Sequence, residues 1–402
     1  MGQNARWERI ETAVVALIQD RRDPRTLGRR ERLFLWTLRR LSALYRLGVQ
    51  LRLFLYDKGI FRYHSLGCQV ISIGNLTVGG TGKTPVVEVF ARDLQKSGRK
   101  VAILSRGYKK EEPEVFVKLL DKILMREKRI PPRVVSDGRT LLLDSRMSGD
   151  EPYMLATHLP DVAVLVDKDR VKSGRYAITK LGCDTLILDD GFQYLSLRHR
   201  LDIVLVDRTN PFGNGYVLPR GILREPSRNI RRASYIFITK CDGTDTEGLR
   251  AQLRKLNPAA EIIECTHRAR FLKDVFTDEA KPLDFLRGLP VAAVSGIAAP
   301  GGFESELERQ GARIVLRKRF ADHHRYTQQQ IIDIINRSHA AGVAAVITTE
   351  KDAVRFPKVD RRDVPIYFLR VDIELLSGTE SFDECISRIC FRRHAAAAAR
   401  PG

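Results

Sequence analysis

Short apolar runs alternate with helix-length segments along most of the chain after Cys68. The runs are rich in β-branched residues, which favour strands, and turn residues separate them. Parallel strands need long, usually helical connections, so this alternation predicts an α/β fold with a mainly parallel sheet and helices on both faces. The predicted strands are 70–73, 101–104, 134–136, 162–166, 185–188, 203–206 and 235–239, followed by a second series at 291–294, 314–316, 343–347 and 366–369.

The chain before residue 68 has a different pattern. Between residues 29 and 62, large apolar and aromatic side chains alternate with arginines. No window of about 18 uncharged residues occurs there, so a membrane-spanning helix is not expected. A basic amphipathic helix of this kind is typical of segments that lie in the membrane interface, with arginines facing lipid phosphates. The alternative is a helix that packs on its own domain and exposes a basic face to solvent.

These patterns divide the chain into three expected parts. They are an N-terminal amphipathic membrane-surface segment at 1–67, a larger α/β domain at 68–265 and a smaller C-terminal α/β domain at 266–369. Residues 370–402 are expected to return to the larger domain. The second boundary is placed between 265 and 290, because prolines interrupt the pattern there. The charged stretch 111–146 is expected to be an excursion from the core, and no function is assigned to it.

Composition limits the classes of protein that remain. Hydrophobic residues make up 43% and charged residues 29% of the chain, as in soluble globular proteins that bury a core. The formal net charge of +20 points to a polyanionic partner, which could be nucleic acid, nucleotide phosphates or an anionic membrane surface. The six cysteines lack Cys-x-x-Cys spacing and indicate buried thiols in a reducing compartment. No secretory signal is expected, because the N-terminus is polar and charged and lacks an apolar core.

A glycine-rich run follows the first predicted strand and precedes a predicted helix at 84–97. This is the layout of a phosphate-binding loop, in which backbone N–H groups surround a polyphosphate, Lys83 contacts the β and γ oxygens and the Thr84 hydroxyl binds Mg²⁺. A nucleoside triphosphate is therefore the leading ligand, and a glycine-rich turn without a ligand is the alternative. The candidate loop residues are Thr77, Val78, Gly79, Gly80, Thr81, Gly82, Lys83 and Thr84.

The match to the usual phosphate loop is imperfect at one position. The full pattern has glycine five residues before Gly82, where this chain has Thr77. The flexible positions have moved to Gly79 and Gly80 instead.

Two aspartates end the predicted strand at 185–188. Asp189 and Asp190 precede Gly191, and a carboxylate at the carboxyl end of a strand beside a phosphate loop is where a further Mg²⁺ contact is expected. The alternative is a polar strand end with an aspartate turn.

Two further segments carry residues suited to proton transfer. Asp150 and Glu151 follow Gly149, and Asp322, His323 and His324 follow an aromatic residue. Phosphoryl transfer to an alcohol gains from a base that accepts the hydroxyl proton, and a carboxylate–imidazole pair would serve. The second segment would also suit the metal ligands of a phosphoesterase, or could be a surface turn.

Three weaker signals remain. The sequence Thr239–Asp242 resembles the guanine-reading motif of GTPases, although the companion Asp-x-x-Gly motif is missing and a strand-end turn is favoured. Arg170 and the pair Arg224-Glu225 are candidates for anion contacts, or for solvated loop charge.

Together these segments resemble the tetraacyldisaccharide 4′-kinase family of lipid A biosynthesis. The agreeing stretches occur in the family's order over most of residues 68–370, and the family has the same shifted phosphate loop. They are ISIGNLTVGGTGKTP, LSRGY, SGDEPYMLA, DRVKSG, ILDDGFQ, LPRGILREP, ITKCD, SGIAAPGGF, FADHHRY and TTEKDAVRF. Two departures are the long stretch 111–146 and Lys109-Lys110, where the family tends to have glycine and arginine.

The resemblance implies ATP-dependent phosphorylation of the 4′-hydroxyl of a tetraacylated glucosamine disaccharide 1-phosphate. It also implies a P-loop NTPase-like domain joined to a smaller α/β domain, with work at the cytoplasmic face of the inner membrane. The expected partners are this lipid and an anionic membrane surface, and no nucleic acid is expected. A regulatory P-loop GTPase or ATPase, or a basic nucleic-acid-binding protein, is the alternative.

The resemblance also carries roles to single residues on the nucleotide side. Lys83 would hold the phosphates of ATP, and Thr84 would help to bind Mg²⁺. Asp189 and Asp190 correspond to the metal-side carboxylates.

On the acceptor side, Asp150 with His323 corresponds to the pair that activates the sugar hydroxyl. Arg170 and Glu225 match further catalytic positions of the family. Glu151 is expected among the metal-side residues.

Overall fold

The computed structural model describes residues 17, 18, 20, 27–107, 130–277, 279–360 and 363–390. The chain forms two compact units, each assembled from separate stretches of sequence. Unit 1 contains residues 1–83, 188–265 and 375–391, and unit 2 contains residues 84–187, 266–374 and 392–402. Three expectations fall partly outside the described residues. They concern the first part of the N-terminal segment, the charged stretch as far as residue 129 with Lys109-Lys110, and the last residues of 370–402.

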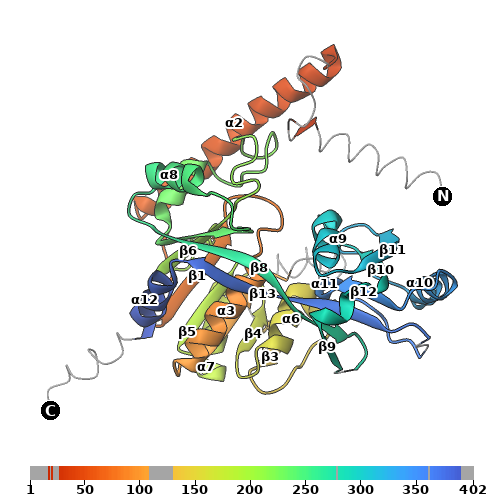
Figure 1. The fold of residues 1–402 in the computed structure, drawn as a ribbon. Coiled ribbons are helices and arrows are strands. Elements are labelled where there is room, and N and C mark those ends of the chain that lie inside the picture. Colours follow the sequence, from red (N-terminus) through yellow and green to blue (C-terminus); the bar gives the residue numbers. More distant parts are fainter. Residues whose placement is uncertain are drawn as a thin grey trace. The chain divides into compact units, whose positions relative to one another are not determined.

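Parallel strands organise unit 1. In sheet order they are β8, β7, β6 and β1, and every neighbouring pair is parallel. The elements of this unit are α2 (Arg29–Asp57), β1 (Gln69–Asn75), β6 (Leu201–Asp207), the 3₁₀ helix η3 (Ser227–Arg232), β7 (Tyr235–Thr239), α8 (Glu247–Leu256), the first residues of β8 (Glu261–Asp274) and α12 (Thr379–Cys390). Figure 1 shows the course of the chain through these elements.

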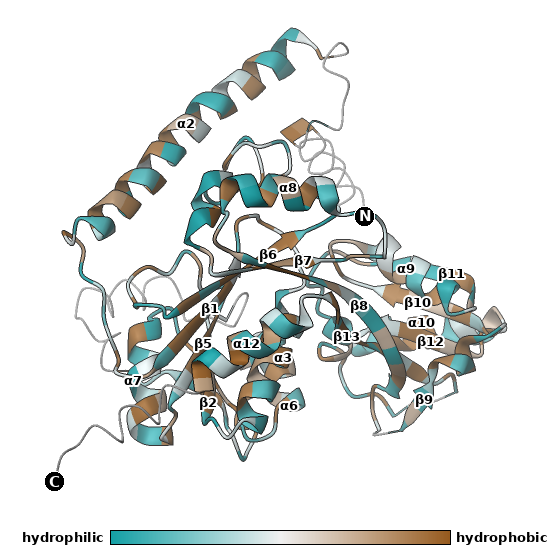
Figure 2. Cartoon of the chain, turned by 60° about the vertical axis from the view of Figure 1, so that its left-hand side comes forward, coloured by the Kyte–Doolittle hydropathy of each residue, from teal (hydrophilic) through white to brown (hydrophobic). Residues whose placement is uncertain are grey.

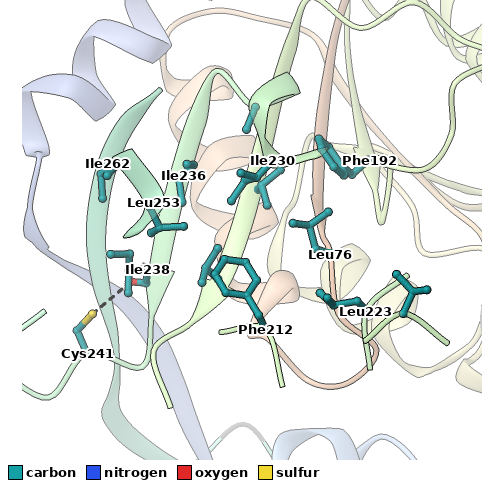
Figure 3. Packing of buried hydrophobic residues seen from close by; sticks show 14 residues of the cluster. Leu76, Phe192, Phe212, Leu223, Ile230, Ile236, Ile238, Cys241, Leu253 and Ile262 are labelled. Carbon is teal, nitrogen blue, oxygen red and sulfur yellow. Dashed lines mark hydrogen bonds between the residues drawn. The ribbon is translucent and has the colours of Figure 1, made fainter. Parts of the chain in front are cut away.

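Strand β7 shows how the sheet of unit 1 is covered on both faces. Ile236 and Ile238 point into a cluster of buried apolar side chains that also contains Leu253 of α8 (Figure 3). Side chains alternate along a strand, so Phe237 faces the other way. Its ring lies 6.4 Å from that of Phe382 in α12, in an edge-to-face arrangement. The apolar run of this strand is therefore explained by burial on both sides.

Unit 2 contains two further groups of strands. β2 and β4 are parallel, with β3 antiparallel to β4, and the series β11, β10, β12 and β13 is parallel throughout. The elements are α3 (Lys83–Lys96), β2 (Val101–Ser105), β3 (Arg133–Asp137), α5 (Ser145–Ser148), α6 (Asp150–His158), β4 (Ala163–Val166), α7 (Arg170–Leu181), β5 (Thr185–Asp189), β9 (Ala280–Pro282), η4 (Leu283–Leu286), β10 (Pro290–Ser295), α9 (Pro300–Arg309), β11 (Arg313–Arg319), α10 (Gln328–Ala340), β12 (Ala345–Thr349), α11 (Glu350–Ala353) and β13 (Ile366–Ser377). The predicted α/β fold with a mainly parallel sheet is confirmed.

Strand β8 was not predicted from the sequence. It occupies the start of the stretch that we expected to hold a domain boundary, and β9 follows it. Its second half carries charged residues and is only partly buried, so it lacks the apolar run that identifies the other strands. Within unit 2 it runs beside β13, and Arg268 forms a two-pronged ion pair with Glu374 at 2.8 and 2.9 Å.

The residue ranges of the two units differ from those of the predicted domains. The domain division therefore stays a prediction. Both divisions have a boundary after Cys265, and the chain returns to unit 1 at Leu375. Residues 84–187, however, belong to unit 2, although the sequence placed them in the larger domain.

Helix α2 carries hydrophobic and hydrophilic residues along its whole length (Figure 2), and most of its apolar side chains are exposed. Hydrogen bonds join it to the rest of unit 1. The Ser42 hydroxyl donates to the Val217 carbonyl oxygen at 2.7 Å, and the Tyr45 hydroxyl donates to the Arg224 carbonyl oxygen at 3.0 Å. In the part of the chain that the structure describes, no helix is long and apolar enough to cross a membrane. The exposed large side chains of α2 are Leu33, Phe34, Trp36, Leu41, Leu44, Tyr45, Leu47, Leu51 and Phe54.

Candidate active site

The glycine-rich sequence forms a tight loop after β1. Its backbone has positive φ at Gly79 (125°) and Gly82 (79°), a conformation that residues with side chains rarely adopt. Two side chains at strand ends hold the loop: Asn75 Nδ2 donates to Thr81 Oγ1 at 3.0 Å, and Thr239 Oγ1 donates to the Thr81 carbonyl oxygen at 2.9 Å. The shape of the loop is therefore fixed by the protein's own hydrogen bonds.

The position of Thr77 explains why the loop does without its usual glycine there. Thr77 is buried, has no positive φ and lies opposite Leu223 in a short antiparallel bridge. The next residue, Val78, donates its backbone N–H to the Ile222 carbonyl oxygen at 2.7 Å. Extended backbone accepts any residue, and the turn that needs glycine comes two residues later at Gly79.

The Lys83 side chain lies at the end of the loop beside two strand-end residues. Its Nζ is 3.4 Å from Asn75 Oδ1 and 3.5 Å from Asp190 Oδ1. The other oxygen of Asp190 accepts from Arg224 Nη1 at 2.7 Å. Burial raises the pKa of Asp190, but the positive charges of Lys83 and Arg224 outweigh this effect and leave its pKa lowered. Asp190 is therefore ionised and holds the lysine beside the phosphate loop.

Two of the expected metal-side residues, Asp189 and Thr84, are buried polar side chains at element ends. Asp189 is the last residue of β5 and is 5% exposed, and Thr84 lies buried in the first turn of α3. No group of three or more His, Cys, Asp or Glu side chains that could hold a metal ion is found among the residues described. Mg²⁺ usually takes only one or two carboxylates, with phosphates and waters as its other ligands. The adjacent carboxylates of Asp189 and Asp190 fit that donor set.

Asp150 and His323 are brought together within unit 2, as the resemblance implied. Asp150 is the first residue of α6, where a helix N-terminus favours a negative charge. Its Oδ2 lies 3.1 Å from His323 Nδ1, and the side chains are 7% and 17% exposed. His323 has a positive φ of 62°, and its backbone N–H donates to the Gly296 carbonyl oxygen at 3.0 Å. The pair has the geometry of a carboxylate–imidazole base.

Two arginines complete the surroundings of the Asp150 carboxylate. Arg355 Nε donates to Oδ2 at 2.8 Å, and Arg325 Nη2 lies 3.4 Å from Oδ1. Burial raises the pKa of Asp150, but the hydrogen bond with His323 and the charge of Arg355 outweigh it, so its pKa is lowered. Asp150 is therefore a carboxylate at neutral pH and can accept a hydrogen bond from the imidazole.

The remaining expected site residues are held by other partners. Glu225 is buried and accepts from Asn229 Nδ2 at 2.8 Å and from Arg232 Nη2 at 2.7 Å. Glu151 forms an ion pair with Lys351 of α11.

Arg170, the first residue of α7, is also buried, and its Nη1 lies 3.4 Å from the Lys168 carbonyl oxygen. His324, the neighbour of the proposed base, stacks on the Phe320 ring at 4.6 Å, and its Nε2 lies 3.0 Å from Gln330 Oε1. The role of His324 is therefore packing at the turn before α10.

The segment that resembled a guanine-reading motif is a strand-end turn. Thr239 supports the phosphate loop, as described above. Lys240, with a positive φ of 59°, pairs with Asp207 Oδ2 at 2.5 Å, and Asp242 pairs with Arg208 at 2.6 Å. These ion pairs within unit 1 account for the polar residues of the segment.

Sequence reasoning missed the residues that support the site. Asn75 and Thr239 hold the phosphate loop, and Arg224 and Arg355 each donate to an active-site carboxylate. Of these four residues, only Arg224 was expected to contact an anion. The expected anion was a ligand, whereas the structure shows the carboxylate of Asp190. A single buried arginine gives no periodic signal, so only the three-dimensional arrangement identifies it.

Comparison with known proteins agrees with this geometry. The sequence model of the tetraacyldisaccharide-1-P 4′-kinase family matches residues 34–390, a span that contains every site residue described above. The chain belongs to this family. It is therefore a kinase of the lipid A pathway, with a P-loop α/β fold.

The relatives within the tetraacyldisaccharide-1-P 4′-kinase family cover most of the chain. The tetraacyldisaccharide 4′-kinase of Anaeromyxobacter dehalogenans strain 2CP-1 is 42% identical over 350 residues, which span 86% of this chain and 88% of the relative. That of Geobacter sulfurreducens is 40% identical over 327 residues, 81% of this chain and 85% of the relative. The crystal structure of Aquifex aeolicus LpxK, described as an "apo" form in complex with ATP, is 29% identical with a TM-score of 0.68, and covers 89% of this chain and 100% of that chain.

The loop geometry predicts different outcomes at two adjacent glycines. A side chain at Gly79 forces a strained backbone at φ 125°, whereas Gly80 has no such φ and open space around its Cβ position. Gly79→Ala should weaken ATP binding about tenfold or more, since such strain costs roughly 1–3 kcal/mol. Gly80→Ala is the matched control and should bind ATP with nearly unchanged affinity. Titration calorimetry of both variants checks this, and equal losses would contradict the loop geometry.

Proposed function

We propose that this kinase transfers the γ-phosphoryl group of ATP to the 4′-hydroxyl of the tetraacyldisaccharide 1-phosphate precursor of lipid A. The observation that carries the proposal is the match to the 4′-kinase family over residues 34–390, in a chain whose phosphate loop has its lysine held beside a strand-end carboxylate. The reaction breaks the bond between the γ-phosphorus and the β–γ bridging oxygen and forms a bond to the sugar oxygen. The hydroxyl proton must leave at the same time.

The phosphate loop and Lys83 would bind the polyphosphate of ATP. The loop supplies backbone N–H groups and Lys83 a positive charge, both of which act on oxygens whose charge changes during transfer. Lys83 is held by Asn75 and Asp190, so its ammonium group is already in place. Little reorganisation is needed before transfer.

Asp189 and Asp190, with Thr84, are the residues that would hold Mg²⁺. When bound, the ion would neutralise negative charge on the β- and γ-phosphates. Asp190 also pairs with Lys83 and Arg224. Glu151 is proposed as a further metal-side group, although its carboxylate is paired with Lys351.

His323, oriented by Asp150, would take the proton from the sugar hydroxyl. With Nδ1–H donated to the Asp150 carboxylate, the Nε2 atom carries the lone pair that accepts the proton. The O–H bond breaks, an N–H bond forms, and the oxygen's electron pair forms the new bond to phosphorus. Arg170 and Glu225 are proposed as supporting residues that fix nearby loops, because both are buried.

The acceptor lipid gives helix α2 its proposed role. An acylated substrate stays in a membrane, so the enzyme must reach it at the cytoplasmic surface of the inner membrane. Large apolar side chains and arginines alternate on the exposed surface of α2, as in helices that lie in the membrane interface. We therefore propose peripheral attachment through α2.

Loss of the phosphate-loop lysine tests the transfer itself. Lys83→Ala should lower phosphoryl transfer by about 10²–10³-fold or more, since it removes a preorganised charge at the transferred group. The measurement is transfer of ³²P from γ-labelled ATP to the lipid disaccharide, with Lys96→Ala, an exposed lysine on the same helix, as control. Near-normal transfer by Lys83→Ala would overturn the proposal.

The Asp150–His323 pair predicts losses that do not multiply. Asp150→Asn and His323→Ala should each lower kcat by about 10²–10⁴-fold, the usual contribution of a general base. If the two act as a unit, the double variant should lose little more than the worse single variant. His339→Ala, at an exposed histidine of α10, should keep full activity. Multiplicative losses would show that the residues act separately.

Membrane attachment through α2 can be tested by charge substitution. Leu44 and Leu47 are each 65% exposed, so replacing both by glutamate should leave the fold intact. Binding to vesicles of zwitterionic and anionic phospholipid should fall at least about tenfold in flotation assays, because buried apolar area is lost. Leu142→Glu, at an exposed leucine of unit 2, is the control and should float like the unchanged protein. Unchanged flotation of the double variant would place the membrane contact elsewhere.

A further inference from the structure

A second carboxylate lies behind the Asp150–His323 pair. Asp352 is fully buried in the one-turn helix α11, which follows β12. Its oxygens accept hydrogen bonds from the Gly296 backbone N–H at 3.0 Å, from the Tyr326 hydroxyl at 2.9 Å and from Thr349 Oγ1 at 2.6 Å. Burial and the neighbouring Asp352 raise the pKa of Tyr326, so its hydroxyl keeps its proton and donates. Asp352 is therefore a carboxylate rigidly held by three donors.

Arg355 connects this carboxylate to the catalytic pair. Its side chain is completely buried, and a buried guanidinium is tolerated only where its donors are used. Nε donates to Asp150 Oδ2 at 2.8 Å, and Nη1 lies 3.2 Å from both the Gly296 carbonyl oxygen and Asp352 Oδ1. Nη2 lies 3.2 Å from His323 Nδ1. The nitrogens of the guanidinium form a planar fork. Its contacts with Gly296 and Asp352 therefore fix the direction from which Arg355 donates to Asp150.

The contacts around His323 Nδ1 cannot all be hydrogen bonds at once. Nδ1 lies 3.1 Å from Asp150 Oδ2, which only accepts, and 3.2 Å from Arg355 Nη2, which only donates. A proton on Nδ1 satisfies Asp150 and leaves the lone pair on Nε2. A lone pair on Nδ1 satisfies Arg355 and puts the proton on Nε2, where it would prevent the ring from taking a proton from the substrate.

We infer that Asp352 and Arg355 form a positioning pair, which holds Asp150 as the acceptor of the His323 Nδ1 proton and so leaves Nε2 as the base. Arg355 already donates Nε–H to the Asp150 oxygen that faces Nδ1, and Asp352 and Gly296 hold Nη1. The guanidinium therefore orients the carboxylate, and the carboxylate selects the tautomer. This inference rests on the proposed role of Asp150 and His323, and neither Asp352 nor Arg355 is expected to touch the substrate.

The carboxylate of Asp150 faces charged groups from two elements. His323 and Arg325 approach from the turn before α10, and Arg355 approaches from the segment after α11. Without the Arg355 fork, Asp150 would lose the donor that fixes its carboxylate toward Nδ1, so kcat should fall.

The experiment compares Arg355→Gln with Arg355→Lys in the full-length enzyme. Arg355→Gln should lower kcat by about 10²-fold, as expected for misplaced catalytic groups, with KM for ATP nearly unchanged. Arg355→Lys keeps the charge but has one nitrogen in place of the fork, so it should also lower kcat. An unchanged kcat in both variants would overturn the inference.

Two further measurements separate positioning from stability. Arg370→Gln is the matched control, since Arg370 is another buried arginine of unit 2 that pairs with carboxylates, at 2.5 Å to Glu88 and 3.1 Å to Glu350. It should lower the Tm without the loss of kcat that Arg355→Gln causes. On an Asp150→Asn background, Arg355→Lys should cause little further loss of kcat, because its effect passes through Asp150. A full multiplicative loss there would overturn the inference even if Arg355→Gln does not fold.

The tautomer can be observed directly. The chain has eight histidines, so the ¹⁵N ring signals of His323 can be identified by their loss in His323→Gln. The unchanged enzyme should show the proton on Nδ1, and an Nε2–H tautomer would overturn the inference.

If Asp150→Asn and His323→Ala were as active as the unchanged enzyme, the proposed function of the pair would fail instead. If instead Asp150→Asn and His323→Ala were inactive while Arg355→Gln kept its kcat, only the positioning role of Arg355 would be refuted.

Discussion

Parallel strand pairing is the constraint on which both parts of the site depend. The carboxyl ends of parallel strands lie at one edge of a sheet, so residues distant in sequence meet there. In unit 1, β1 and β7 end at Asn75 and Thr239, and both side chains hold the same threonine of the phosphate loop. In unit 2, β10 and β12 are neighbours that end shortly before Gly296 and Asp352, which are hydrogen-bonded to each other. One packing rule thus generates two polar clusters.

Unit 2 contains buried arginines that each pair with more than one carboxylate. Arg355 lies between Asp150 and Asp352, and Arg370 lies among other carboxylates. Burial raises the pKa of Glu88, but contacts with a histidine and with Arg370 outweigh it and hold its pKa at about 2. Such networks add little net stability when desolvation is counted, but removing one member leaves its partner uncompensated. They fix geometry more than they add to the free energy of unfolding.

The sequence predicted the repeated elements and the short motifs well. Central strands such as β1, β5 and β7 are buried on both faces, and the turn at Gly79 and Gly82 needs glycine, so both left clear signals. Strand β8 was missed because its second half is charged and half-exposed. Arg355 was missed because a lone arginine in a sequence gives no sign that it is buried. The meeting of Asp150 with His323 could be expected only from family resemblance, since 173 positions separate them.

The carbonyl oxygen of Gly296 accepts from two groups that belong to different parts of the base. It receives the backbone N–H of His323 at 3.0 Å and Arg355 Nη1 at 3.2 Å. A side chain at this position would meet Asp352 Oδ1 at 2.9 Å and the Tyr326 hydroxyl at 3.0 Å, so only glycine fits here without a shift of these groups. One peptide group therefore joins the backbone of His323 to the guanidinium of Arg355, so the base and the arginine that orients its carboxylate partner share a single anchor in the main chain.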